Sequence, residues 1–181
     1  MLCIGTYSSP LGELTLACND QALTGLWLDH ETCQEATGSP EVEVRPDAPV
    51  LKLAGEWLDA YFTGKKPGPG GLPLAPPGTP FQQLVWKLLC AIPYGECATY
   101  GDIAREAATA LHKERMSARA VGAAVGRNPI SIIVPCHRVV GARGNLTGYG
   151  GGIKKKVLLL MHEGADMRRL SLPRRGKYAV R

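Results

Sequence analysis

The sequence has no apolar run of membrane-spanning length, and residues 1–7 lack the basic start and long apolar stretch of a secretion signal. We therefore expect a protein that stays in the cytoplasm, without a membrane partner. Hydrophobic residues make up 45% and charged residues 20% of the 181 residues, which is typical of a globular chain. This length allows one large domain or two small ones.

Cysteine pairs with the spacing of a metal site are also missing. The six cysteines are dispersed along the chain, and none forms a C-x-x-C pair. This pattern predicts free thiols in a reducing compartment and no zinc site built from cysteine pairs. We expect no metal and no cofactor. The glycine-rich segment 141–152 is not followed by Gly-Lys-Ser/Thr and so is not a P-loop, although its backbone amides are suited to line a pocket or bind a phosphate.

Positive charge is scarce in one half of the chain only. Residues 1–80 carry four basic and ten acidic residues, whereas residues 81–181 carry 17 basic and six acidic ones. The net charge of +5 therefore hides an acidic first half and a strongly basic second half. This asymmetry indicates either a solvated basic surface or a second half that meets a polyanion such as DNA.

Residues 1–78 have the pattern of a small α+β domain. Three short segments with partial apolar alternation predict an antiparallel meander that begins with a hairpin, and they span residues 6–10, 13–18 and 22–28. A helical period follows over 48–62 and stops at Gly64. Proline and glycine then dominate residues 65–80, which predicts a linker, with an extended edge segment at 72–74. The domain boundary is expected near Thr79.

Residues 79–165 are expected to form a second, mainly helical domain, and residues 166–181 a basic tail that is only partly ordered. The predicted helices span 80–91, 99–111, 117–125 and 153–162, with Thr79 and Ser117 as N-cap residues. Helix, turn and helix is a DNA-binding outline. The helix at 117–125 consists mostly of alanine and glycine, which favours either tight helix packing or insertion into a DNA groove with Arg119 as its long basic side chain.

Cys136 is the candidate nucleophile, because it lies between two β-branched apolar segments, 131–134 and 139–140, which are predicted to be extended. A cysteine attacks as its thiolate, so it needs a neighbouring base or positive charge, and His137 and Arg138 are adjacent. Neighbouring residues of an extended chain point to opposite faces, so a bridging water is expected between Cys136 and His137. The local pattern alone also fits a buried structural cysteine.

Several strings in the second half match one known family. They are Val85-Trp86-Lys87-Leu88-Leu89, Thr99-Tyr100-Gly101-Asp102-Ile103-Ala104, Ala118-Arg119-Ala120-Val121-Gly122, Asn128-Pro129, Pro135-Cys136-His137-Arg138-Val139-Val140, Leu146-Thr147-Gly148-Tyr149 and His162-Glu163-Gly164. With these strings the chain resembles the O6-alkylguanine-DNA alkyltransferases, also called methylated-DNA–protein-cysteine methyltransferases. Ser9-Pro10-Leu11-Gly12 also resembles the N-terminal hairpin of that family.

The resemblance implies an RNase H-like domain followed by a winged helix-turn-helix domain that binds double-stranded DNA through the minor groove, in a protein expected to be a monomer. It also implies a DNA repair reaction of one turnover. The alkyl group of O6-alkylguanine, and of O4-alkylthymine, would move irreversibly to Cys136. A soft alkyl carbon suits a soft thiolate, and guanine is a tolerable leaving group once protonated.

The same resemblance assigns roles to other residues. His137 would act as the base through water, Glu163 would orient it, and Asn128 would hold the geometry of the segment. Tyr100 would donate to guanine N3, and Arg119 would replace the extruded nucleotide in the base stack. Further DNA or base contacts are expected from the carbonyls of Cys136 and Val139, the amide of Gly150, and residues Tyr149, Arg138, Ala118 and Ala120.

Some features depart from the family or leave other classes open. The loop over 111–116 is longer than in shorter relatives, Gly150 stands where many members have serine or alanine, and the zinc ligands of animal members are not matched. The run 154–156 of three lysines is expected on a solvated or phosphate-facing surface. The alternatives are a non-catalytic lesion-binding protein, a helix-turn-helix regulator, and a Cys-His hydrolase that turns over repeatedly.

Overall fold

The structure is a computed structural model that describes residues 2–28 and 42–173. The chain forms two compact units, the first made of Met1–Pro77 with Pro129–Ile133, the second of Gly78–Asn128 with Val134–Arg181. Across the described ranges, no helix combines the length and apolar character needed to cross a membrane.

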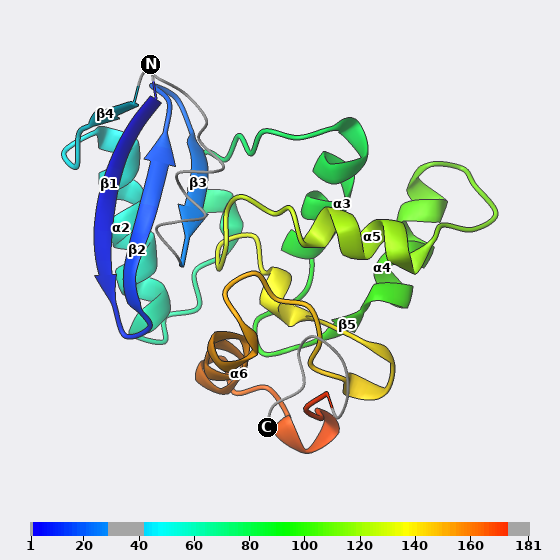
Figure 1. Cartoon of the computed structure of the whole chain (residues 1–181). Helices are drawn as coiled ribbons and strands as arrows, with labels where there is room; N and C mark the ends of the chain where they lie inside the picture. The colour runs from blue at the N-terminus through cyan, green and yellow to red at the C-terminus, as the bar shows by residue number, and fades with distance from the viewer. Residues whose placement is uncertain (1, 29–41, 174–181) are drawn as a thin grey trace. The chain divides into compact units, whose positions relative to one another are not determined.

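A four-stranded sheet is the base of the first unit (Figure 1). Its strands are β1 (Leu2–Ser9), β2 (Gly12–Cys18), β3 (Leu23–Trp27) and β4 (Val42–Val44), in the order β3-β2-β1-β4. β1, β2 and β3 pair antiparallel, which confirms the predicted meander and its first hairpin. β4, which the sequence pattern did not predict, runs parallel to β1.

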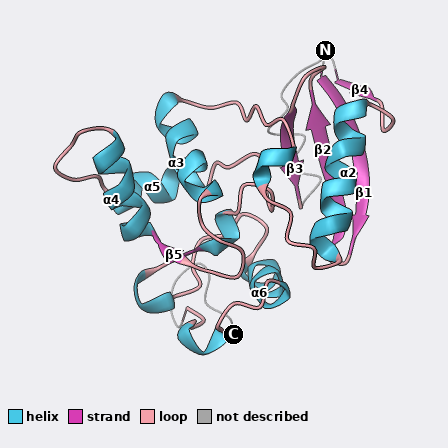
Figure 2. Ribbon diagram, turned by 180° about the vertical axis from the view of Figure 1, so that it is seen from behind, coloured by secondary structure: helices cyan, strands magenta, loops and turns pink. Residues whose placement is uncertain are grey.

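Helix α2 (Pro49–Phe62) covers one face of this sheet (Figure 2). It buries its apolar stripe, including Leu51, Leu58 and Tyr61, and Gly64 follows its end with a φ of +79°. The predicted helix and its glycine stop are thus confirmed. The 3-10 turn η1 (Pro69–Gly71) interrupts the proline-rich segment that follows.

Two further segments lie beside β3 in the first unit. Leu74 forms a parallel bridge with Leu23, which confirms the extended edge expected at 72–74. Ile130 forms a parallel bridge with Leu26, and the Leu26 amide donates to the Pro129 carbonyl at 2.8 Å. Residues 131–134 do not continue as a strand, so the extended conformation predicted there is wrong. Ile132 has a φ of +69°, which turns the chain at that point.

Three helices with side-chain N-caps open the second unit. They are α3 (Pro80–Cys90), α4 (Tyr100–Ala110) and α5 (Ala118–Val125), and they confirm the helices predicted there. Thr79 and Thr99 each form a capping box, and Ser117 accepts from the first amides of α5. The indole of Trp86 on α3 donates to the Ala124 carbonyl on α5 at 2.9 Å, which fixes these two helices against each other.

The remainder of the second unit surrounds a short parallel pair of strands, β5 (Ala98–Thr99) and β6 (Val139–Val140). The 3-10 turn η2 (Cys136–Arg138) leads directly into β6, and η3 (Ala142–Gly144) follows it. The predicted last helix is confirmed as α6 (Ile153–His162). Beyond it, η4 (Met167–Arg169) packs partly buried apolar side chains on the core of this unit, and residues 174–181 of the predicted tail lie outside the described part.

Candidate active site

Cys136 begins a single 3-10 turn and is almost fully buried, with 6% of its surface exposed. Cys136 and His137 therefore do not lie on opposite faces of an extended chain, as the sequence pattern predicted. Burial raises the pKa of the Cys136 thiol, while a hydrogen bond with the Asn128 side chain and the charge of Lys156 lower it. The thiol thus depends on its neighbours to ionise. Cys136 is one of five free cysteines in the described ranges, and Cys33 lies outside them.

Asn128 connects the end of α5 to the segment before the cysteine. Its backbone amide donates to the Val125 carbonyl at 3.1 Å, and its side-chain amide donates to the Val134 carbonyl at 2.9 Å. The same side chain is hydrogen-bonded to the Cys136 thiol. Asn128 therefore contacts both the backbone and the thiol of the segment whose geometry it is expected to hold.

His137 and Glu163 form a buried pair. Nε2 of His137 lies 2.6 Å from Oε1 of Glu163, and the two side chains are fully buried. Since the carboxylate can only accept, Nε2 carries the proton and Nδ1 is the unprotonated nitrogen. Nδ1 has no hydrogen-bond partner among the described residues. Burial lowers the pKa of His137 below its ordinary 6.5, so the neutral imidazole is the base at neutral pH.

Arg138 completes this cluster by holding Glu163 from the other side. Its Nε and Nη2 donate to the two carboxylate oxygens at 2.8 and 3.0 Å, and Nη1 donates to the Ile92 carbonyl at 2.6 Å. Its guanidinium carbon also lies 5.6 Å from the ring centroid of Tyr94. Arg138 is 8% exposed, and its charge pairs with the buried Glu163 carboxylate. This departs from the DNA contact, and from the direct support of Cys136, that the sequence suggested.

The carboxylate of Glu163 remains ionised because of these donors. Burial alone raises the pKa of Glu163, but hydrogen bonds from His137 and Arg138 outweigh it and hold the pKa well below its usual range. The backbone amide of Gly95 adds a third donor at 3.0 Å. Gly95 has a φ of +79°, and a Cβ there would lie 2.7 Å from the Glu163 carbonyl oxygen, so only glycine allows this approach.

Tyr100, at the first position of α4, faces the loop that follows β6. Its hydroxyl lies 3.3 Å from the Thr147 carbonyl oxygen and 3.2 Å from that of Gly148. Gly148 has a φ of +67°, and a Cβ there would lie 2.9 Å from the tyrosine hydroxyl. In the same loop Tyr149 is buried and its hydroxyl has no partner in the described ranges, whereas Gly150 is exposed.

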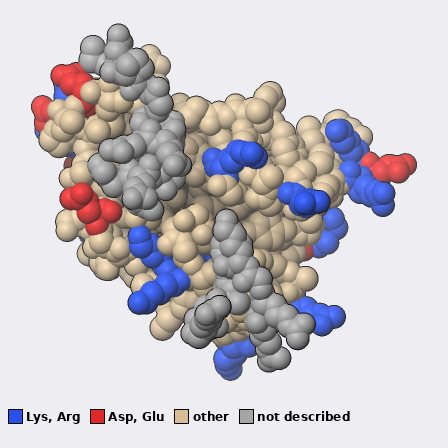
Figure 3. Space-filling view, viewed as in Figure 1, with Lys and Arg blue, Asp and Glu red and all other residues tan. Residues whose placement is uncertain are grey.

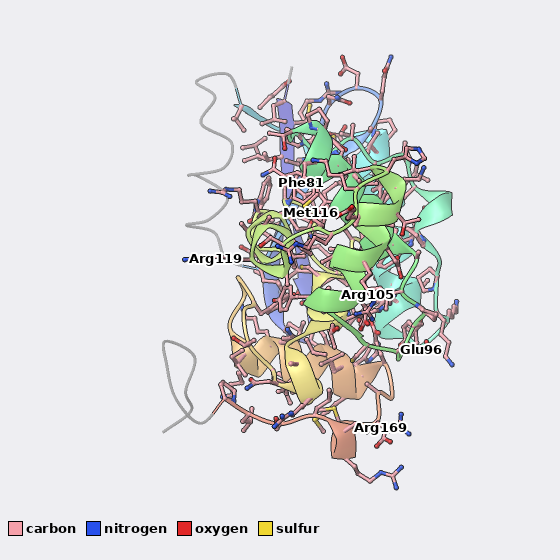
Figure 4. All side chains as sticks on the ribbon, turned by 90° about the vertical axis from the view of Figure 1, so that its right-hand side faces the viewer. Phe81, Glu96, Arg105, Met116, Arg119 and Arg169 are labelled. Carbon is pink, nitrogen blue, oxygen red and sulfur yellow. The ribbon has the colours of Figure 1, made fainter. Side chains whose placement is uncertain are left out.

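The small residues of α5 divide between two surfaces. Val121, Ala124 and Val125 are buried, whereas Ala118 and Arg119 are exposed and Ala120 is half-buried. Arg119 extends from α5 beyond its neighbours, on the side away from Arg105 (Figure 4). Lys and Arg side chains lie at several separate places on the face drawn in Figure 3. In and next to α5, the exposed basic residues are Lys113, Arg115, Arg119 and Arg127.

The site combines a buried thiol with a neutral histidine and its carboxylate, which suits transfer of a group to the cysteine. The exposed small residues of α5, with one arginine among them, suit contact with DNA. Family models match both units. Residues 80–165 match the DNA binding domain of 6-O-methylguanine DNA methyltransferase, and residues 2–76 match its ribonuclease-like domain.

The chain belongs to the 6-O-methylguanine DNA methyltransferase family.

Curated relatives in this family are similar over most of their length. The methylated-DNA–protein-cysteine methyltransferase of Mycobacterium tuberculosis H37Rv is 46% identical over 155 residues, covering 86% of this chain and 88% of the relative. That of Methanosarcina barkeri is 43% identical over 164 residues, covering 88% and 96%. The family resemblance seen in the sequence is thus confirmed, for bacterial and archaeal members alike.

Solved structures of the family share the fold. The crystal structure of Mycobacterium tuberculosis OGT in complex with DNA superposes with a TM-score of 0.77 at 43% identity, covering 93% of this chain and 94% of that one. The Pyrococcus kodakaraensis O6-methylguanine-DNA methyltransferase gives a TM-score of 0.61 at 26% identity, covering 91% and 100%. These matches confirm the α+β class, with a ribonuclease-like domain before a DNA-binding domain.

Sequence reasoning missed Lys156, which it placed on a solvated or phosphate-facing surface with its two neighbours. Lys154 is exposed and Lys155 half-buried, but Lys156 is fully buried. The helical period could have shown this, because Lys156 lies three residues after Ile153 and three before Leu159, and both of these are buried. A run of three lysines nevertheless reads as surface, since an unpaired buried lysine is rare.

Proposed function

We propose that this chain repairs DNA by moving the alkyl group of O6-alkylguanine irreversibly to Sγ of Cys136, once per molecule. The observation that carries the proposal is the arrangement next to the thiol. His137 is buried beside Cys136 in η2, donates a hydrogen bond from Nε2–H to the Glu163 carboxylate, and keeps Nδ1 as an unprotonated base. The names of the relatives, methylated-DNA–protein-cysteine methyltransferases, support the same reaction.

The chemical step balances with the groups present. The thiol proton passes to Nδ1 of His137, directly or through a water, and leaves a thiolate. A new bond forms between Sγ and the alkyl carbon as the bond between that carbon and O6 breaks. The electron pair stays with guanine, which takes up one proton. The product thioether has no route back to a thiol, so the protein is consumed.

The base-binding side of the site is proposed from the loop and helices around the thiol. Tyr100 is the donor to guanine N3, and the carbonyls of Cys136 and Val139 with the amide of Gly150 contact the base edge. Tyr149, which is buried in the same loop, is proposed as a further contact of the base. O6 lies inside the duplex, so the nucleotide must be extruded, and the exposed Arg119 takes its place in the stack.

The small side chains of α5 support insertion of this helix into the minor groove. Ala118 is exposed and Ala120 half-buried, and neither would hold the DNA backbone at a distance. We propose the cytoplasm as the setting, because the acceptor thiol must stay reduced. A lesion-binding or regulatory protein needs no thiol beside a buried base, so those alternatives explain less of the site.

Stoichiometry tests the proposal. A fixed amount of protein is incubated with increasing excess of a duplex carrying one O6-methylguanine, and restored guanine is counted. We expect a plateau at one guanine per protein. Continued turnover would indicate a hydrolase, and DNA binding without restored guanine would indicate a lesion sensor or regulator. Either result would overturn the proposal.

A further inference from the structure

Lys156 is a buried cation that the proposed reaction does not yet use. It lies in the middle of α6, with none of its surface exposed, between the half-buried Lys155 and Val157. Burial of an ammonium group is unfavourable unless the group is hydrogen-bonded and faces negative charge. The contacts of Lys156 therefore indicate what its burial achieves.

The ammonium group joins two segments of the second unit through their backbone. Nζ of Lys156 donates to the Val139 carbonyl in β6 and, at 3.1 Å, to the Thr147 carbonyl in the loop that follows. The Thr147 carbonyl is also one of the two that face the Tyr100 hydroxyl. Lys156 thus binds the Val139 carbonyl, which is proposed to contact the base. It also binds the Thr147 carbonyl together with Tyr100, which is proposed to donate to guanine N3.

The loop between β6 and α6 has little regular structure to hold it in place. Gly144, Gly148 and Gly152 all have positive φ, from +67° to +85°, which are conformations that glycine adopts without strain. The loop is attached on one side through Leu146, whose amide donates to the Ser171 carbonyl at 2.8 Å. Lys156 supplies an attachment on the other side, to the strand that follows the acceptor cysteine.

The charge of Lys156 also matters to the thiol. Arg138 is already bound to Glu163 through two hydrogen bonds, so its charge is largely compensated. Lys156 and Cys136 affect each other: the lysine lowers the pKa of the thiol, and the thiol opposes the burial that lowers the pKa of Lys156 to about 8. The other titratable groups that influence Lys156 or that it influences are Cys97 before β5 and His137 in η2.

We infer that Lys156 is a positioning residue of the acceptor site, which fixes the loop after β6 against the Val139 carbonyl and holds a positive charge at the strand that directly follows η2 and its Cys136. The inference rests on the proposed function, since it assigns to Lys156 a part in the same transfer. It extends that function to a residue that is fully buried and is hydrogen-bonded to two backbone carbonyls.

The test compares Lys156→Met, which keeps the length but removes charge and donors, with Lys156→Gln, which keeps a donor without charge, and Lys156→Arg, which keeps both. Lys154→Met on the exposed side of the same helix is the matched control. Circular dichroism and thermal melts select the folded variants. Single-turnover methyl transfer from a duplex with one O6-methylguanine gives the rate at saturation, and binding of unmodified duplex gives the affinity.

We expect Lys156→Met to slow methyl transfer at saturating DNA by about 100-fold, because a small misplacement of reacting groups has an effect of this size. Its affinity for unmodified duplex should stay within about twofold of wild type. Lys156→Gln is expected between Met and wild type, and Lys156→Arg to react faster than Lys156→Met. Lys154→Met should react at the wild-type rate. Wild-type transfer by a folded Lys156→Met or Lys156→Gln protein would overturn the inference.

A second readout needs no methylated DNA. The rate at which iodoacetamide modifies Cys136, followed on its own peptide by mass spectrometry, rises with pH as the thiolate forms. Loss of the Lys156 charge should move this rise to higher pH in the Met and Gln variants but not in Lys154→Met. If the pH dependence of Cys136 modification is the same in the Met and Gln variants as in wild type, the Lys156 charge does not act on the thiol. If wild-type protein fails to accept methyl, the proposed function falls, while this profile still tests the coupling of Lys156 to Cys136.

Discussion

The two units of this protein have cores of different chemistry. Among the described residues, the first unit buries one polar side chain, Thr15, within an otherwise apolar core of sheet and helix. The second unit buries four side chains of histidine or charged residues, namely His137, Arg138, Lys156 and Glu163. Apolar burial stabilises a fold directly, whereas buried charges stabilise it only when they are fully paired. The difference indicates that the second core is arranged for chemistry.

The largest effect should follow from changing Glu163 to glutamine. Arg138 would keep its burial but lose its carboxylate, and His137 would lose the acceptor that fixes its tautomer. We expect methyl transfer to slow by about 10² to 10⁴-fold, and the free energy of unfolding to fall by about 3 kcal/mol. Single-turnover kinetics and urea unfolding measure the two effects. Glu106→Gln, on the exposed side of α4, is the control. Near-normal transfer by Glu163→Gln would show that the buried pair is not part of the chemistry.

The core of the first unit should respond in stability alone. Leu58 on α2 is fully buried, so Leu58→Ala is expected to lower the free energy of unfolding by about 2 to 5 kcal/mol. Leu53 on the same helix is 45% exposed and provides a milder control. The transfer rate of the protein that remains folded should not change. A slower transfer rate in folded Leu58→Ala would show that the core of the first unit also affects the reaction, contrary to this prediction.

Acidification is expected to act through the charged core. Burial keeps the pKa of His137 below its ordinary 6.5, so the unfolded chain takes up a proton that the folded one does not once the pH falls below 6.5. The donors around Glu163 hold its pKa below the ordinary 4.5, so its stabilisation is complete above 4.5 and is lost as the pH falls further. Urea unfolding from pH 8 to pH 3.5 should show stability falling in these two stages. In Glu163→Gln the second stage should be much reduced, and a flat wild-type profile would contradict the assignment.

The smallest effect on stability should come from Arg119, which is exposed on α5. Arg119→Ala is expected to change the free energy of unfolding by less than about 0.5 kcal/mol, yet to weaken duplex binding roughly tenfold. Fluorescence anisotropy with a labelled duplex measures the affinity, and Lys87→Ala, exposed on α3, tests whether any loss of positive charge has the same effect. Equal losses in both variants would mean that Arg119 contributes only general charge.

Local signals were sufficient to predict most of the helices and the first hairpin. Thr79 before Pro80 and Ser117 before the alanine-rich helix begin α3 and α5 where their capping chemistry requires. β4 was not predicted, because its parallel pairing with β1 depends on a partner far away in the sequence. The fold class was predictable mainly because the motifs resemble a known family.

The site was predictable in its residues and less so in their contacts. The string from Pro135 to Val140 identified Cys136 and His137, but alternation of apolar residues suggested an extended chain where the structure has a 3-10 turn. The sequence analysis expected a DNA contact from Arg138 and a solvated or phosphate-facing position for Lys156, because charged side chains are usually exposed. Tertiary contacts with Glu163 and with two backbone carbonyls bury them, and no local pattern encodes those partners.

The central claim is that Cys136 accepts the alkyl group, and intact mass tests it most directly. Wild-type protein and Cys136→Ser are each mixed with an excess of a duplex carrying one O6-methylguanine. We predict that the wild type gains the mass of one methyl group and no more, and that the variant gains none. An unchanged wild-type mass with DNA still bound, or a methyl group on the Cys136→Ser variant, would contradict it.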